Sequence, residues 1–111
     1  MLIEVRTDHN FQGSERFSDQ VKEVVNAALE RHSDHVRRID VHLSDAIGNK
    51  AGQDDKCCMI ELRRDGREPI VVKHQESTMD KAIQGAVHNL KTSIESAFGK
   101  ESVREQLRDH H

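Results

Sequence analysis

The hydrophobic pattern of this chain changes period twice, and this change restricts the fold more than any other feature of the sequence. Apolar residues recur every three or four positions between residues 17 and 29 and again between 79 and 97, which is the spacing of a buried helix face. Between them, three short segments alternate apolar and polar residues, which predicts strands with one buried and one solvated face. These segments are 39–44, 57–63 and 70–73, and residues 2–6 predict a fourth strand.

The predicted order β-α-β-β-β-α indicates an α+β fold in a single domain. We expect a four-stranded, antiparallel-rich sheet with both helices packed on one face. The domain is expected to span residues 1–98, and residues 99–111 are expected to form a charged, flexible tail because they have almost no apolar residues.

Local signals predict where the helices and turns lie. Ser14 is the expected cap of the first helix, which should end at Ser33-Asp34. Ser77 is expected to cap the second helix, with Asp80 in a capping box, and Gly99 to end it. Three further features place the strand connections: a glycine-bearing link at 46–55, a hairpin turn at Asp65-Gly66-Arg67, and Pro69 at a strand start.

Residues 42–58 concentrate polar and thiol side chains and are the first candidate for a chemical site. Cys57 and Cys58 should point to opposite faces of a strand, so they cannot bind one ion together as a Cys-x-x-Cys pair does. The acidic residues of this segment lack the spacing of a calcium loop. We therefore interpret it as a soluble hairpin loop, with Cys58 as a small core residue. A metal- or thiol-dependent enzyme is the alternative.

Other catalytic signatures are missing from the sequence. It contains no G-x-S-x-G, no H-E-x-x-H and no glycine-rich phosphate loop after a strand. His32 and His35 have ligand-like spacing, but the favourable charge and solvation of a helix end explain them more simply. We therefore expect a non-enzyme with no catalytic residue, no metal, no cofactor and no small-molecule substrate.

Composition restricts the class of partner. The net charge is −3, and with no Trp, no Tyr and three Phe the chain has few aromatic platforms on which single-stranded bases could stack. No apolar run approaches the roughly 20 residues that cross a bilayer, so no membrane association is expected. The two cysteines are adjacent, and a bond between neighbours would be strained, which favours reduced thiols and a cytoplasmic location.

Four stretches of residues 2–98 resemble one protein family in their order and spacing. They are VRTDHN with GSER, then ALERHSDHVRRIDVHLSD, then GQDDKCCMIELR, and finally PIVVKHQESTMDKAIQGAVHNL. They are similar to the ribosome hibernation-promoting factor and ribosome-associated inhibitor family, also described as sigma-factor modulation proteins.

This resemblance implies a domain similar to a double-stranded-RNA-binding domain. It also implies a cytoplasmic factor of stressed or stationary-phase bacteria that binds the small ribosomal subunit and its rRNA. Such a factor fills the channel for messenger and transfer RNA and stops translation by steric occlusion. Some family members carry a further domain that pairs ribosomes, and we expect no such dimerisation domain here.

Basic residues near the end of the first helix and along the second are the expected contacts with rRNA phosphates. They are Arg31, Arg37, Arg38, Lys73, Lys81, His88 and Lys91. Ala28, Asn89 and Thr92 stand where the family often has cations, so we expect weaker and less salt-sensitive binding.

A protein-interaction module is the competing hypothesis. Its surface would be the solvated face of the sheet, where the predicted strands place charged residues beside apolar ones. These residues are Asp40, His42, Glu61 and Lys73, with Met59 and Val71. Arg63 and Arg64 are expected to keep a strand tip soluble.

Overall fold

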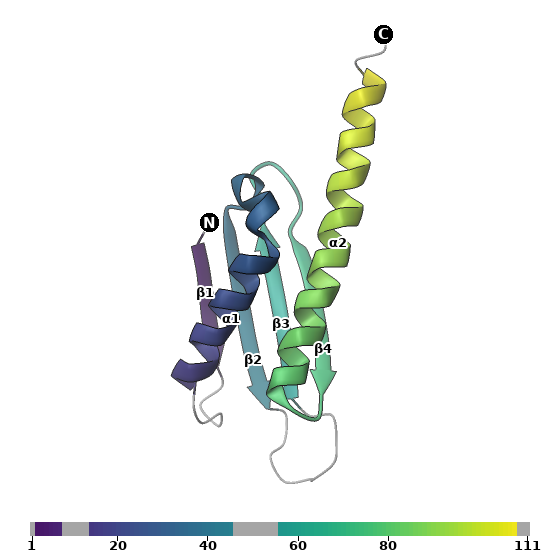
Figure 1. Cartoon of the computed structure of the whole chain (residues 1–111). Helices are drawn as coiled ribbons and strands as arrows, with labels where there is room; N and C mark the ends of the chain where they lie inside the picture. The colour runs from purple at the N-terminus through teal and green to yellow at the C-terminus, as the bar shows by residue number, and fades with distance from the viewer. Residues whose placement is uncertain (1, 8–13, 46–55, 109–111) are drawn as a thin grey trace.

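The computed structural model describes residues 2–7, 14–45 and 56–108, and it confirms the predicted order of elements. One four-stranded sheet is covered by two α-helices (Figure 1). The elements are β1 (Leu2–Thr7), α1 (Ser14–Ala28), the 3-10 helix η1 (Glu30–His35), β2 (Arg38–Asp45), β3 (Lys56–Arg63), β4 (Ile70–Glu76) and α2 (Met79–Arg108). The expected link at 46–55 and the last three residues of the expected tail lie outside the described residues.

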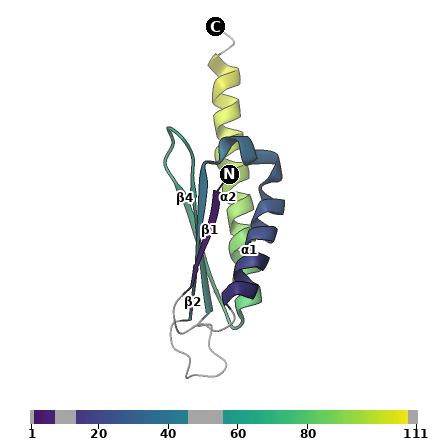
Figure 2. The same cartoon turned by 90° about the vertical axis from the view of Figure 1, so that its left-hand side faces the viewer.

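The strands lie in the order β1-β2-β3-β4. β1 runs parallel to β2 because α1 returns the chain to the end of the sheet at which β1 begins. The other two strand pairs are antiparallel. Both helices cover one face, while the opposite face, here called the open face, carries no helix (Figure 2). The predicted placement of both helices on a common face is confirmed.

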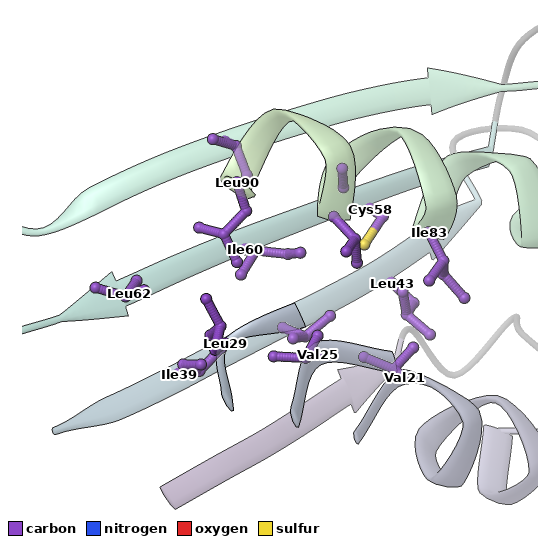
Figure 3. Close-up of a cluster of buried hydrophobic side chains, with 14 of the residues drawn as sticks. Val21, Val25, Leu29, Ile39, Leu43, Cys58, Ile60, Leu62, Ile83 and Leu90 are labelled. Atoms are coloured by element: carbon purple, nitrogen blue, oxygen red, sulfur yellow. The ribbon is translucent and has the colours of Figure 1, made fainter. Parts of the chain in front are cut away.

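The core fills the space between this face and the two helices. Val21 and Val25 of α1, Leu29 just after this helix, and Ile83 and Leu90 of α2 meet the inward residues of the strands (Figure 3). These inward residues include Ile39, Val41, Leu43, Cys58, Ile60 and Leu62, and all of them are buried. Period-two alternation therefore assigned the buried face of β2 and β3 correctly, and Cys58 is the core residue expected from its position.

All four ends of α1 and α2 differ from the expected ones. α1 ends at Ala28 instead of Ser33-Asp34, and the chain tightens into η1, where the His32 amide donates to the Leu29 carbonyl at 2.9 Å. The expected α1 cap, Ser14, is itself the first residue of the helix. The hydroxyl that caps α2 is that of Thr78 and not Ser77, because buried Met79 must already lie on the helix. Thr78 Oγ1 accepts from the Lys81 amide at 3.3 Å.

Gly99 does not end α2, which continues to Arg108. A glycine inside a helix costs only about 1 kcal/mol relative to alanine, and the Lys, Glu, Arg and Gln residues that follow are good helix formers. Gly66 is the described glycine with a positive φ, at +71°, which confirms the predicted hairpin turn.

α2 approaches β4 closely at Gly85. The His74 ring faces this glycine from β4, and its Nε2 donates a hydrogen bond to Glu76 Oε1 at 2.9 Å. A Cβ at residue 85 would lie 2.6 Å from His74 Cγ, and still nearer to other ring atoms. The helix can therefore lie at this height over the sheet only because residue 85 has no side chain.

We expect Gly85→Ala to lower the free energy of unfolding by about 1–3 kcal/mol, because overpacking outweighs the gain in helix propensity. Urea unfolding followed by circular dichroism measures this change. The matched control is Gly99→Ala on the same helix, where no atom lies within 4 Å of the new Cβ, and which should stabilise. In a His74→Ala background Gly85→Ala should also stabilise. If Gly85→Ala leaves the wild-type protein as stable as before, the close approach does not constrain α2.

Burial raises the pKa of the Cys58 thiol to about 12, with a smaller contribution from Cys57. The unfolded thiol loses its proton at a lower pH, so the contribution of Cys58 to stability is intact below about pH 9 and falls as the pH rises toward 12. Between pH 8 and 10, we expect the free energy of unfolding of wild type to fall by about 1 kcal/mol relative to that of Cys58→Val. Urea unfolding at both pH values measures it, and a constant difference would contradict burial of this thiol.

Candidate nucleic-acid interface

The basic residues expected to contact RNA fall into separate parts of the structure. Arg31 on η1 and Lys81, His88 and Lys91 on α2 are all exposed and belong to the helix layer. We call these four residues the helix surface. The other three are elsewhere: Arg37 lies in the turn before β2, Arg38 starts β2, and Lys73 is on β4.

The helix surface follows from the amphipathic pattern of α2. Val87 and Leu90 point into the core, so the neighbouring polar positions 88 and 91 must face outward. Spacings of seven and three keep Lys81, His88 and Lys91 along one side of the helix, as expected. Arg31 and Lys91 line the same hollow between η1 and α2, which brings cations from two elements together. Glu30 and Glu95 also line this hollow and limit its positive charge.

Phe98 anchors η1 and the β3–β4 turn to α2. The rings of His32 and His35 meet its ring edge-on, with centroids 4.8 and 5.7 Å away. The Arg64 guanidinium lies over the Phe98 ring, 5.0 Å from the ring centroid, and forms a cation–π contact with it. The ligand-like spacing of the two histidines thus serves an aromatic contact. No cluster of three or more His, Cys, Asp or Glu residues suited to a metal occurs in the described part of the chain.

Arg38 and Lys73 lie on the open face, away from the helix surface. Arg38 donates to Glu4 Oε2 at 2.7 Å and to Asp40 Oδ1 at 3.0 Å. The hydrogen bond with Asp40 raises the pKa of Arg38, against an opposing effect of desolvation. Two carboxylates therefore already compensate the charge of Arg38. In register, Lys73 lies beside Met59, which is one of three large exposed apolar residues of this face; the others are Leu2 and Val71.

The strand register also gathers arginines that the sequence analysis did not connect. Arg38 lies directly opposite Arg63, and a groove at this end of the sheet brings together distant parts of the chain. We call it the arginine groove; it is lined by Leu2, Arg37, Arg38, Glu61, Arg63, Arg64, Arg67 and Pro69. Only the β2–β3 register could have revealed it, and that register has no local signal in the sequence.

The polar segment at 42–58 is described only at its two ends. Lys56 Nζ and Asp45 Oδ2 form an ion pair at 2.6 Å across the ends of β3 and β2. Cys57 and Cys58 are both reduced and both buried, on opposite faces of β3. None of the described helices is long and apolar enough to span a membrane.

Comparison with known proteins identifies the relationship. Residues 4–110 match the model of the family described as Sigma 54 modulation protein / S30EA ribosomal protein. The fold is similar to that of a ribosomal subunit interface protein from Coxiella burnetii, at 19% identity and a TM-score of 0.65, over 89% of this chain and 99% of that one. It is also similar to the N-terminal domain of Protein Y from Thermus thermophilus, at 24% identity and a TM-score of 0.68, over 86% and 98% of the two chains. No curated protein matches the sequence.

We expect Phe98→Leu to lower the free energy of unfolding by about 1–2 kcal/mol, because leucine keeps the apolar volume but loses the edge-on and cation–π contacts. The direct readout is NMR of the His32 and His35 ring protons, which should shift when the neighbouring aromatic ring is removed. Phe17→Leu on α1 is the matched control and should leave both histidine signals in place. Unchanged histidine signals in Phe98→Leu would show that η1 does not pack on this ring.

Proposed function

The chain belongs to the Sigma 54 modulation protein / S30EA ribosomal protein family, and from this premise we propose that it binds the rRNA of the small ribosomal subunit. Members of this family are non-enzymatic, ribosome-associated factors, which implies a cytoplasmic location. By filling the channel for messenger and transfer RNA, the protein would hold ribosomes inactive during stress or stationary phase. The Coxiella burnetii protein of similar fold is a ribosomal subunit interface protein, which supports the same partner.

The observation that carries this proposal is the exposed helix surface on a rigid support. Lys81, His88 and Lys91 project from a helix whose opposite side is fixed in the core. Cations held in this way can contact rRNA phosphates at a lower entropic cost than cations on a flexible loop. The mechanism needs no bond to be made or broken, since occlusion depends only on shape and affinity.

A protein-interaction module remains the second candidate, and one observation favours it. The large exposed apolar residues Leu2, Met59 and Val71 all lie on strands of the open face. Apolar residues gathered on one solvated face are typical of a protein-binding surface. Asp40 and Glu61, beside them on the same face, would disfavour RNA there by repelling phosphates.

We expect Lys81→Glu combined with Lys91→Glu to abolish co-sedimentation with small ribosomal subunits without unfolding the protein, because it replaces two attractive contacts by repulsion. Sedimentation through sucrose at low and raised salt measures the loss, and wild type should be released as salt rises. Circular dichroism checks the fold.

The matched control reverses the same number of charges on the open face, in Arg6→Glu with Lys73→Glu. This variant should keep more of its sedimentation with the subunits than the helix variant does. If the helix variant still pellets at moderate salt while the open-face variant does not, rRNA contacts the sheet and the helix surface is wrong. If wild type itself stays at the top of the gradient, the protein-interaction module is the better account.

A further inference from the structure

The arginine groove brings five arginines together in a chain that is negative overall. Glu61 lines the groove with them, and Glu4, Asp40 and Asp65 pair with Arg38 and Arg37 from outside its lining. Arg37 precedes β2 and Arg38 begins it. Arg63 ends β3, and Arg64 and Arg67 lie between β3 and β4. Figure 1 places this end of the sheet beside η1, and Figure 2 shows the β3–β4 hairpin bending away from the helices.

The fold holds these arginines together at a cost. Arg38 and Arg63 are direct cross-strand partners, and the Arg37 amide donates to the Arg63 carbonyl at 2.9 Å. Like charges placed opposite each other in a sheet are destabilising. The neighbouring carboxylates relieve the repulsion only in part: the Arg37–Asp65 pair, for example, is 3.3 Å long, with side chains 74% and 82% exposed. A pair so exposed contributes little to stability.

The guanidinium groups of Arg37 and Arg63 are oriented but not saturated. Arg63 donates from Nε to Glu61 at 2.8 Å, and Arg64 is held over the Phe98 ring. Each guanidinium carries five N–H donors, so the contacts of Arg37 with Asp65 and of Arg63 with Glu61 leave most of their donors available to a ligand. Arginine forks of this kind match the oxygen atoms of a phosphate group.

The groove is open and continues onto the sheet. A second hollow on the open face shares Arg38, Glu61 and Arg63 with it, but Asp40 also lines that hollow, so the proposed contact stays at the groove. Several arginines spread along one groove suit a chain of phosphates better than a single phosphate. Leu2, whose exposed fraction is 51%, and Pro69 add apolar surface at the same place, against which a sugar or a base can lie.

We propose that the arginine groove binds the phosphodiester backbone of RNA through Arg37, Arg63 and Arg67, as a contact separate from the helix surface. In the ribosome this RNA would be rRNA, and that identification rests on the proposed function. The helix surface would bind RNA through the helix layer of the fold. The groove would bind RNA at the end of the sheet. Binding at both places would then be bivalent, so that each contact strengthens the other.

The test uses the full chain and a fluorescein-labelled single-stranded RNA of about 12 nucleotides, with anisotropy measured at several salt concentrations. We expect Arg63→Gln with Arg67→Gln to weaken binding about tenfold at low salt and to reduce the slope of log K against log salt by about 1.4, for two lost contacts. Lys22→Gln on α1 with Lys100→Gln on α2 removes the same charge outside the groove and should change the affinity less than about twofold. Arg63→Lys with Arg67→Lys should keep the slope and lose part of the affinity, because it keeps the charge but not the fork.

Arginine Nε–Hε NMR signals of the wild-type protein supply a readout that does not depend on a variant folding. The Arg63 and Arg67 signals should shift and saturate as the same RNA is added. Three results would overturn the proposal: equal losses in the two charge-matched glutamine variants, no shift of these signals, or displacement of the RNA by equimolar ATP or pyrophosphate. The last would identify a site for free phosphates instead.

This test separates the two proposals. If wild type sediments with small subunits but the groove variant binds RNA as wild type does, the groove proposal fails and the proposed function stands. If wild type does not sediment with subunits but the groove signals shift with RNA, the proposed function fails and the groove proposal stands.

Discussion

Burial of a single face of the sheet by two amphipathic helices is the constraint on which the rest of this structure depends. Among the side chains described at 2–7, 17–45 and 56–99, no polar or charged residue is buried. The charged groups of these residues therefore lie on the outside of the helices, on the open face or at the ends of the sheet. These residues enclose no polar centre, so their charged groups can contact a partner only at the surface of the protein.

The position of α2 converts this constraint into a defined surface. Gly85 sets the height of the helix over β4 by admitting the His74 ring, and Phe98 fixes the helix against η1 and the β3–β4 turn. Two attachment points about 20 Å apart along a helix, at 1.5 Å per residue, leave little freedom of rotation. The direction in which His88 and Lys91 project is consequently determined by packing and not by the charged residues themselves.

The sequence was sufficient for features that depend on period and insufficient for features that depend on register. Alternation identified Ile39, Ile60 and Val72 as inward residues, because a strand offers only two faces. It could not show that Arg38 lies opposite Arg63, because a shift of one residue in the pairing would separate them and no local pattern fixes the pairing. Helix ends failed for a related reason: Ser77 and Thr78 offer the same chemistry, and the burial of Met79 decides between them.

A net charge of −3 is compatible with binding to RNA because charges act locally in salt. The Debye length is about 10 Å at 0.1 M ionic strength, whereas a helix of 30 residues such as α2 is about 45 Å long. Acidic residues far along the molecule are therefore screened from a phosphate at the arginine groove, which responds to the arginines beside it and to Glu61. The sum over the chain measures solubility and long-range repulsion, whereas recognition depends on how the strand register and the helix packing distribute the cations.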